Sequence, residues 1–508
     1  MAIKMLINAM EMEEYRVAII GDGTLHGFYI ETTAAEQITG NIYKGVIERI
    51  EPSLQACFVN YGAEKSGFLS ISDVHPEYYL EGFTVKEDQG PPPINKVLKK
   101  GQEILVQVTK EMPGSKGAQL TTYLSLASRY VVLTPGRPGG GISKKIEDEG
   151  ERSRLKEIMS QFTLPEGVGY IVRTAAAKQN KRELSRDLNR LLRIWKGIKK
   201  NVKKDPTFSL VHKEQDLCLR TLRDYLTREI KEILIDDKET FTKIKEHIKV
   251  ISPWHQRRVK LYKDKRPIFD HYGIEEQIET IYCNRVELKS GGSIVIDPTE
   301  ALIAIDVNSG RGRSGKDIEA TAFNTNKEAA VEIARQLRLR DFGGLVVIDF
   351  IDMKERSHNR EIEKLLREST KEDRAKIDMS GISKFGLLEL SRQRLRPSIE
   401  SISYQVCPNC QGRGLVPSVE SASLSLLRRI SGGASRAGVV RLNGSLPMGV
   451  ATYLQNRKRK ELALLESRYN VEILLQADPS LAPGEGKIEL VHDDTASKDV
   501  SDSSKSVN

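Results

Sequence analysis

The chain has 508 residues, 39% of them hydrophobic, and a formal net charge of +9. That length allows three or more domains of about 150 residues each. No apolar run is long enough to span a bilayer, and residues 1–7 lack the basic and apolar segments of a signal peptide, so a cytoplasmic protein is expected. The basic excess is compatible with a polyanionic partner. Five cysteines, an odd number in a long chain, indicate a reducing compartment and not a disulfide framework.

The pattern of apolar runs, turns and charges divides the chain into eight segments. About five short strands with glycine between them, in the second segment, are typical of a small barrel such as an OB-fold. The Ser/Asp/Lys-rich tail is expected to be disordered. In chain order the segments are strands in 1–38, the barrel in 39–125, a strand, a loop and a long basic helix in 126–215, an α/β region in 216–282, strands and a helix in 283–402, a Cys/Gly linker in 403–416, a small α/β domain in 417–491, and the tail in 492–508.

Two hydrophobic strands in the fifth segment each end in an aspartate. One runs over 301–305 and ends at Asp306, and the other runs over 345–348 and ends at Asp349. Short, nearly continuous apolar runs predict strands that are buried on both faces of a parallel sheet. Because neighbouring strands lie about 4.8 Å apart, two such carboxylates could share one cation.

Two further polar residues lie close to this pair in the sequence: Asn308 follows Asp306, and Asp352 lies three residues after Asp349. Asn308 lies two residues after Asp306 and therefore on the same strand face, where its amide could contact a phosphate or hold Asp306 in place. Mg²⁺ prefers oxygen ligands and commonly uses one or two carboxylates with phosphate oxygens and water, and it can activate water at a phosphoryl centre. A lone strand-terminal Asp more often caps the next loop or helix, so the local pattern leaves a metal site and a capping role open.

The helix between the two strands is predicted to begin at a capping box formed by Thr325 and Glu328. The residues that follow it, Ala329, Ile333 and Leu337, repeat at helical spacing. They predict one apolar helix face.

Cys407 and Cys410 have zinc-knuckle spacing within a Gly-rich linker. Structural zinc takes four ligands, and the other cysteines lie far away in predicted strands or helices, with no histidine nearby. The motif is therefore half of a zinc site completed by a second chain, or a redox pair. Because a redox motif should open a helix, we favour a four-cysteine site shared between two protomers. Two unligated thiols remain the alternative.

The barrel segment carries Phe58, Tyr61 and Phe68 among several lysines, which include Lys116. Aromatic rings stack on unpaired bases while lysines follow the phosphates. Each aromatic residue could equally belong to the barrel core. The pattern therefore leaves nucleic-acid binding and simple packing open for each of them.

Arg173 and Thr174 end a strand in the third segment. A guanidinium group and a hydroxyl together suit a terminal phosphate, although the pattern alone favours an ordinary surface arginine. The loop 136–141 is rich in glycine but lacks the spacing of a nucleotide-binding loop. We interpret it as a flexible loop.

Five motifs together resemble those of the ribonuclease E/G family, and they lie at 305–311, 321–326, 347–353, 391–395 and 407–410. The resemblance extends from the first strands to about residue 490. It implies an α/β and β multidomain fold: an RNase H-like subdomain in two parts (1–38 and 216–282), an S1-type OB barrel (39–125), a 5′-sensor region (126–215), a DNase I-like catalytic subdomain (283–402), a zinc link (403–416) and a small C-terminal α/β domain (417–491).

The resemblance implies a Mg²⁺-dependent endoribonuclease. The expected substrate is single-stranded, A/U-rich RNA, with stimulation by a 5′-monophosphate, 5′-phosphate and 3′-hydroxyl products, and roles in rRNA processing and mRNA decay. It also implies a homodimer joined through structural Zn²⁺, which could assemble further into a homotetramer. The competing hypotheses are a non-catalytic RNA-binding protein built on the barrel and a zinc-catalysed hydrolase.

The resemblance also assigns roles to residues. Asp306 and Asp349 match the ligands of the catalytic Mg²⁺, and Asn308 matches a residue that orients them or the scissile phosphate. Cys407 and Cys410 match the zinc link. The pocket for a 5′-monophosphate is matched by Arg173, Thr174 and Val132, and the RNA-contacting positions of the barrel are matched by Phe58, Phe68 and Lys116.

The sequence departs from the family pattern in two places. Ser128 stands where some members have glycine in the 5′ pocket, and Lys65 with Ser66 replaces a more familiar basic residue and histidine. The chain also has no long Arg/Pro-rich extension after the small domain. It is therefore expected to be closest to ribonuclease G or to a short ribonuclease E core.

Overall fold

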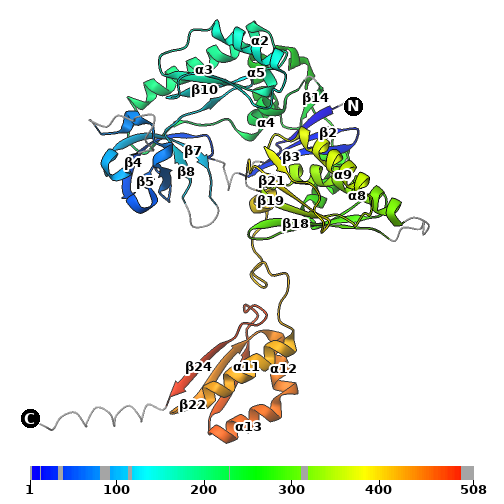
Figure 1. Ribbon diagram of the computed structural model, residues 1–508. Helices are drawn as coiled ribbons and strands as arrows, with labels where there is room; N and C mark the ends of the chain where they lie inside the picture. The colour runs from blue at the N-terminus through cyan, green and yellow to red at the C-terminus, as the bar shows by residue number, and fades with distance from the viewer. Residues whose placement is uncertain are drawn as a thin grey trace, which may run out of the picture. The chain divides into compact units, whose positions relative to one another are not determined.

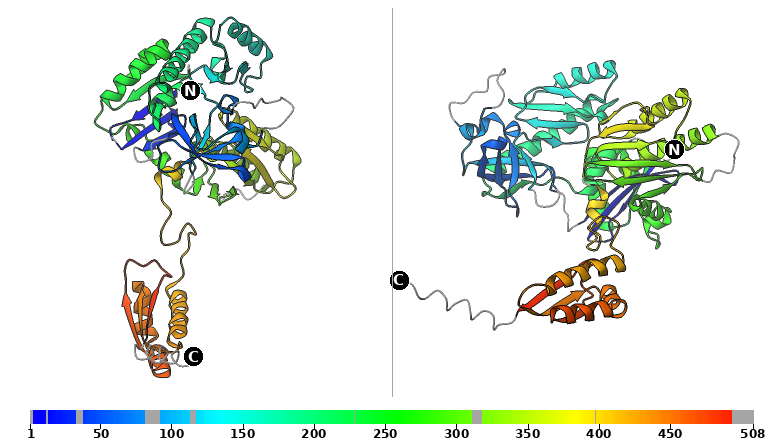
Figure 2. Two further views of the ribbon diagram at one scale, coloured as in Figure 1. Left: turned by 90° about the vertical axis from the view of Figure 1, so that its left-hand side faces the viewer. Right: turned by 60° about the horizontal axis from the view of Figure 1, so that its bottom comes forward.

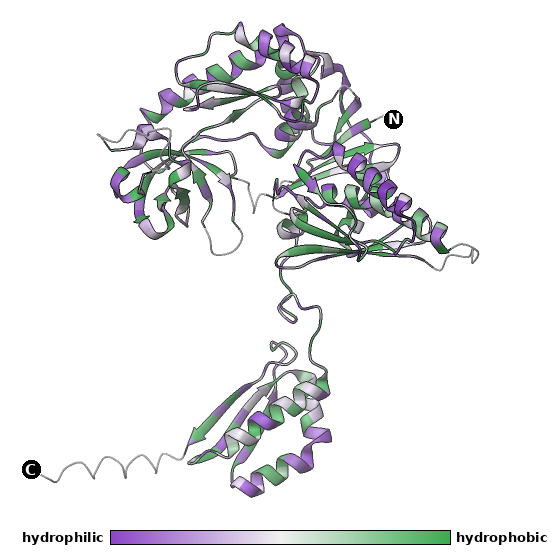
Figure 3. Cartoon of the chain, in the orientation of Figure 1, coloured by the Kyte–Doolittle hydropathy of each residue, from purple (hydrophilic) through white to green (hydrophobic). Residues whose placement is uncertain are grey.

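The computed structural model forms two compact units, Met1–Ser403 and Tyr404–Asn508 (Figure 1). Hydrophobic residues concentrate along the strands, whereas the helices alternate between hydrophobic and hydrophilic stripes (Figure 3). Within the part of the chain that the structure describes, no helix is both long and apolar enough to cross a membrane. The described residues are 3–11, 13–32, 38–80, 92–112, 117–227, 229–310, 318–396 and 398–492.

The first sheet of the larger unit has the strand order β15-β14-β1-β2-β3 and joins two segments that are far apart in the sequence (Figure 2). A two-residue turn at Asp22 and Gly23, both with positive φ, connects β2 to β3. The elements are β1 (Ile3–Asn8), β2 (Glu14–Gly21), β3 (Thr24–Thr32), α4 (Leu217–Tyr225), β14 (Ile230–Ile235), α5 (Lys238–Ile251), β15 (Val259–Leu261), α6 (Ile268–His271) and α7 (Glu275–Glu279).

Five strands close into a barrel in the order β4-β5-β6-β8-β7, because β7 also pairs with β4. Gly67 permits this closure, since a Cβ at this position would lie 2.4 Å from a methyl group of Leu120. The closed five-stranded barrel confirms the small barrel predicted for this segment. Its elements are β4 (Ile42–Glu51), β5 (Ala56–Asn60), β6 (Gly67–Ser70), α1 (Ile94–Val97), β7 (Glu103–Lys110) and β8 (Gln119–Thr121), with β13 (Ser209–His212) added at β4.

A four-stranded sheet with the order β11-β12-β10-β9 follows the barrel. The predicted basic helix is present as α3 and begins after Asn180, whose side chain accepts a hydrogen bond from the backbone of Glu183 at 3.0 Å. The expectation of a flexible loop over 136–141 is wrong at its end, because Gly140 starts β11 and packs against the ring of Tyr170. The elements are β9 (Leu126–Ala127), β10 (Val131–Pro135), β11 (Gly140–Ile142), α2 (Glu149–Ser160), β12 (Val168–Val172) and α3 (Lys181–Val202).

The second large sheet carries both strand-end aspartates and has the order β16-β17-β18-β19-β21-β20. Helices α8 and α9 share one hydrophobic core with it (Figure 1). The elements are β16 (Arg285–Glu287), β17 (Ser293–Pro298), β18 (Leu302–Asn308), α8 (Ile318–Leu339), β19 (Gly344–Asp349), α9 (Arg356–Ser369), β20 (Ile377–Met379), β21 (Leu387–Arg392) and α10 (Ile399–Ser403).

This sheet corrects the predicted surroundings of the aspartates. Its strands are not buried on both faces of a parallel sheet: β18 and β19 run parallel, but their outer neighbours β17 and β21 are antiparallel to them. Buried and exposed residues alternate along β18 from Ile303 to Asn308. The shared core lies on one face, so the other face is open and carries the exposed side chains of Asp306, Asn308 and Asp349 together with that of Leu345.

Helix α8 begins before the predicted capping box. Thr325 lies inside the helix, where its hydroxyl donates to the carbonyl of Thr321 at 2.9 Å. Glu328 accepts a hydrogen bond from the backbone N–H of Ser290 at 2.9 Å instead of capping the helix. The predicted apolar face is correct, since the residues that form it are fully buried: Ala329, Ile333 and Leu337.

The smaller unit is a three-stranded sheet with the order β23-β22-β24, packed against three helices. The predicted disordered tail falls outside the described residues, apart from His492 at the end of β24. The elements are α11 (Val419–Ala434), β22 (Val439–Leu446), α12 (Met448–Arg457), α13 (Arg459–Tyr469), β23 (Glu472–Ala477) and β24 (Lys487–His492).

Candidate functional site

Asp306 and Asp349 are direct partners in the register of β18 and β19. Both side chains are exposed on the open face of the sheet. The amide nitrogen of Asn308 donates to a carboxylate oxygen of Asp306 at 2.6 Å. Two roles were expected for Asn308, and this hydrogen bond corresponds to the one in which Asn308 holds Asp306 in place.

A third carboxylate, that of Asp352, also affects the charge of Asp349. Partial desolvation by the surrounding chain raises the pKa of Asp349, and the negative charges of Asp306 and Asp352 raise it further. Gly386 lies beside both groups: a Cβ at this position would be 3.3 Å from an oxygen of Asp352 and 3.9 Å from an oxygen of Asp349. The absence of a side chain at Gly386 leaves these oxygens uncovered.

This donor set fits a hard divalent cation. A cation would relieve the repulsion that raises the pKa of Asp349. Across the described residues, no group of three or more His, Cys, Asp or Glu side chains is arranged to hold a metal. Two carboxylates are nevertheless enough for Mg²⁺, which completes its shell with water and substrate phosphate.

The turn after β19 is fixed by a residue to which the sequence assigned no role. Asn326 is fully buried in α8, and its side chain donates to the carbonyl of Ile351 at 2.8 Å and accepts from the N–H of the same residue at 3.1 Å. Ile351 lies between Asp349 and Asp352, so this pair of bonds orients the chain that carries both carboxylates. The only signal in the sequence is that Asn326 belongs to one of the family motifs.

The predicted 5′-phosphate residues lie at the end of β12. One terminal nitrogen of Arg173 donates to the carbonyl of Ser128, and the other pairs with Asp224, each at 2.7 Å. Thr174 is exposed directly after it. Val132 is half-buried on β10, opposite Ile171 of β12. Both terminal nitrogens of Arg173 thus have fixed partners, while its side chain remains 25% exposed.

The departure at Ser128 has a structural explanation. Its hydroxyl is buried and bonds to the carboxylate of Asp187 at 2.5 Å. The other oxygen of Asp187 accepts from the backbone N–H groups of Tyr130 and Val131. The serine side chain therefore connects this loop to helix α3, while its carbonyl holds Arg173.

Two aromatic residues of the barrel form a pair on neighbouring strands. Phe58 and Phe68 are register partners on β5 and β6, with ring centroids 6.0 Å apart, and both are half-buried. The guanidinium group of Arg49 lies 4.7 Å from the ring of Phe58. Tyr61 is only 3% exposed and belongs to the core. Lys116 lies outside the described residues.

Cys407 and Cys410 lie in a turn of the smaller unit, where Cys407 is exposed and Cys410 half-buried. Backbone N–H groups of Gly414 and Gly412, helped by the Cys407 side chain, lower the pKa of the Cys410 thiol. A lowered pKa favours the thiolate, the form that binds Zn²⁺. The donors therefore fit half of a zinc site.

The fold and these sites define a class of protein: an α/β chain with an acidic site on an open sheet face and a closed barrel of the kind that binds oligonucleotides. Residues 125–395 match the model of the Ribonuclease E/G family, residues 36–122 that of the S1 RNA binding domain, and residues 406–491 that of the RNase E/G thioredoxin-like domain. The chain belongs to the ribonuclease E/G family.

Known relatives place the chain within this family. It is 50% identical over 479 residues to ribonuclease E of Haemophilus influenzae, an alignment that covers 94% of this chain and 51% of that protein. It is 38% identical over 436 residues to ribonuclease G of Escherichia coli, covering 85% and 88%. The chain thus spans about half the length of the ribonuclease E proteins of Haemophilus influenzae and Escherichia coli. Both relatives named in the expectation, ribonuclease G and ribonuclease E, are therefore found, with the higher identity to ribonuclease E.

Proposed function

We propose that this chain is a Mg²⁺-dependent endoribonuclease that cleaves single-stranded RNA. The observation that carries the proposal is the register pairing of Asp306 with Asp349 on an open sheet face, with Asn308 bonded to Asp306. The two aspartates would hold the ion, which when bound supplies a Lewis acid at the scissile phosphate. Family membership and the names of the relatives support this activity.

The proposed products define which phosphorus–oxygen bond breaks. Water attacks phosphorus, the bond to the 3′-oxygen breaks, and that oxygen takes up a proton, which leaves a 5′-phosphate and a 3′-hydroxyl. The open sheet face suits an extended polymer, and the Phe58–Phe68 pair on the barrel suits stacking on unpaired bases. The preference for A/U-rich RNA and the roles in rRNA processing and mRNA decay belong to the same proposal.

Two further sites complete this function. Arg173, with Thr174 beside it, binds a 5′-monophosphate and so favours RNA with that end; its fixed guanidinium group and partly exposed side chain support this role. Cys407 and Cys410 supply half of a structural Zn²⁺ site, which the same pair from a second copy completes. The resulting homodimer can pair again into a tetramer.

The test is cleavage of an end-labelled single-stranded RNA in Mg²⁺ by the wild type, Asp306→Asn and Asp349→Asn, with identification of the product ends. Both variants should lose cleavage while they still bind the RNA. Asp378→Asn is the matched control, because Asp378 is an exposed aspartate on β20 of the same sheet. Wild-type rates in either variant would show that its aspartate does not hold a catalytic ion, whereas a wild type that binds the RNA without cleaving it would leave RNA binding without catalysis as the function.

A further inference from the structure

One enclosed carboxylate, that of Asp224, lies among arginines from three segments. It is the penultimate residue of α4, and its side chain is 14% exposed. Its Oδ1 atom lies 2.7 Å from Nη2 of Arg173, 3.2 Å from Nε of Arg223 and 3.9 Å from Nη1 of Arg374. The three partners come from the end of β12, from α4 itself and from the segment before β20.

The charge of Asp224 is fixed by these neighbours. Burial alone would raise the pKa of Asp224, but the charges of Arg223, Arg173 and Arg374 outweigh it and lower the pKa to about 2. The group is therefore a carboxylate at any pH near neutrality. It serves as a permanent acceptor shared by three guanidinium groups.

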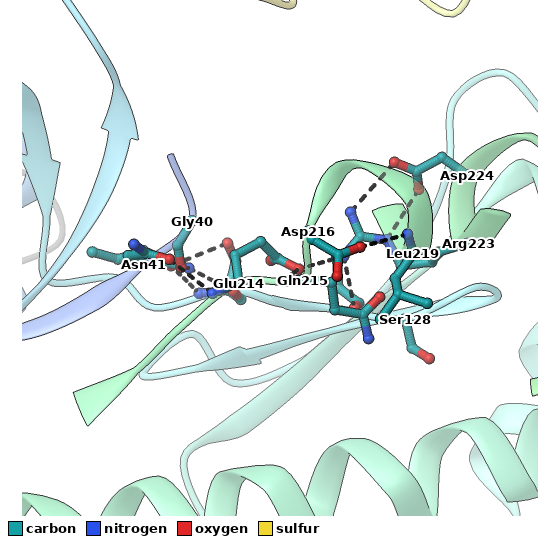
Figure 4. A network of polar contacts seen from close by, with 12 residues as sticks. Gly40, Asn41, Ser128, Glu214, Gln215, Asp216, Leu219, Arg223 and Asp224 are labelled. Carbon is teal, nitrogen blue, oxygen red and sulfur yellow. Dashed lines mark hydrogen bonds and ion pairs between the residues drawn. The ribbon is translucent and has the colours of Figure 1, made fainter. Parts of the chain in front are cut away.

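Arg223 connects this carboxylate to the start of the barrel. The same guanidinium group that bonds Asp224 donates to Glu214 at 2.8 Å (Figure 4). The backbone N–H of Glu214 donates to the side chain of Asn41, the residue before β4, at 2.8 Å. A continuous set of contacts therefore joins the barrel to Asp224.

Arg173 depends on Asp224 more than the other two arginines do. Arg223 also has Glu214, and Arg374 packs over the ring of Tyr225 at 3.9 Å. Arg173 has a backbone carbonyl on one terminal nitrogen and Asp224 on the other. These two anchors fix the plane of its guanidinium group, and a group fixed in advance loses less conformational entropy when it binds a ligand.

We propose that Asp224 is a positioning residue for recognition of the 5′-monophosphate. It holds the guanidinium group of Arg173 in the orientation that receives the phosphate, and it is itself held through Arg223 and Glu214 from the barrel. This inference rests on the proposed binding of the 5′-monophosphate by Arg173. It adds a specificity determinant that does not touch the RNA.

The test compares one single-stranded oligonucleotide in 5′-monophosphate and 5′-hydroxyl forms. In Asp224→Asn, the KM for the 5′-monophosphate form should rise about tenfold, the size of one charge-assisted hydrogen bond. The kcat and the kinetics on the 5′-hydroxyl form should stay unchanged. Asp224→Glu keeps the charge one methylene further out and should give an intermediate preference.

Glu31→Gln is the matched control. Glu31 is an enclosed carboxylate on β3. It pairs at 3.1 Å with Arg220 of α4, the helix that also carries Asp224, and accepts from the N–H of Leu217 at 2.9 Å. This variant also loses an ion pair on α4, but not one to Arg173, so its 5′-end preference should equal that of the wild type. A ratio of two kcat/KM values does not depend on the folded fraction, so partial unfolding does not obscure the result.

The outcomes separate the two proposals. A wild-type enzyme without any 5′-end preference contradicts the role of Arg173, and this inference with it. A wild-type preference that Asp224→Asn retains overturns the role of Asp224 alone. Equal losses on both substrates in Asp224→Asn assign the residue a purely structural role and also overturn the proposal.

Discussion

Two carboxylate clusters of this chain have opposite surroundings. Asp349 lies on an open sheet face, where partial desolvation and the charges of Asp306 and Asp352 raise its pKa. Asp224 is enclosed by arginines that lower its pKa to about 2 despite its burial. Adjacent negative charges attract a cation from solution, whereas a carboxylate whose charge is balanced by arginines holds those arginines in place. The negative charges of the first cluster repel one another at a cost in stability, whereas the carboxylate of the second fixes the geometry of the arginines around it.

The largest expected difference between the clusters concerns stability. Asp224→Ala should lower the free energy of unfolding by about 3 kcal/mol, because it removes the counter-charge that the enclosed Arg223 shares with the partly exposed Arg173 and Arg374. Asp306→Ala should leave stability unchanged or raise it, since it removes a charge that repels Asp349. Urea unfolding of both variants measures the contrast. Similar losses in the two would show that the clusters do not differ in this way.

Activity should show the reverse ranking. Asp306→Asn and Asp349→Asn should each reduce kcat by about 10²–10³-fold, the range seen when one preorganised electrostatic contact to a transition state is lost. Asp224→Asn should leave kcat on a 5′-hydroxylated RNA within about twofold of the wild type, because Asp224 touches none of the reacting atoms. Single-turnover cleavage measures both, and an equal loss of kcat in all three variants would contradict the division of roles.

The pH dependence of stability should have opposite signs at the two clusters. The pKa of Asp224 is about 2 in the folded chain and lies below its ordinary value of 3.8. Its stabilisation, about 2 kcal/mol, is therefore present above pH 4 and lost as the pH falls towards 2. For Asp349 the folded pKa is raised, so its ionisation destabilises the fold as the pH rises through that value.

Unfolding of the wild type, Asp224→Asn and Asp349→Asn between pH 2 and about pH 7 checks these signs. The deficit of Asp224→Asn relative to the wild type should disappear at the acid end. Asp349→Asn should be more stable than the wild type at neutral pH and equal to it in acid. A deficit of Asp224→Asn that persists at the acid end would assign its effect to packing instead of charge.

Local pattern in the sequence was enough to find the strand-end aspartates, the basic helix α3 and the small barrel. It could not show that one face of the aspartate sheet is open, because which face the helices cover is decided by tertiary packing. The same limit explains the helix start: the spacing of Thr325 and Glu328 fits a cap, but both side chains bond elsewhere in the folded chain.

Two supporting residues were missed for a related reason. Asn326 acts on Ile351, 25 residues away, and Asp224 joins arginines from three separate segments. Such contacts have no periodicity in the sequence, so no local rule predicts them. The residue type alone does not predict the surroundings either, since Asp224 and Asp349 are both aspartates but have pKa values shifted in opposite directions.

The smallest expected effect is stabilisation by the ion itself. At tenfold excess over its Kd, Mg²⁺ should add about 1.4 kcal/mol to the free energy of unfolding of the wild type by mass action. It should add much less to Asp349→Asn, which loses one of the two carboxylates, and the full amount to Asp224→Asn and to Asp378→Asn. Thermal unfolding over a Mg²⁺ titration measures these differences. If Asp349→Asn responded like the wild type, the stabilising ion would bind elsewhere, and the repulsion at Asp349 would have to be relieved by protonation instead.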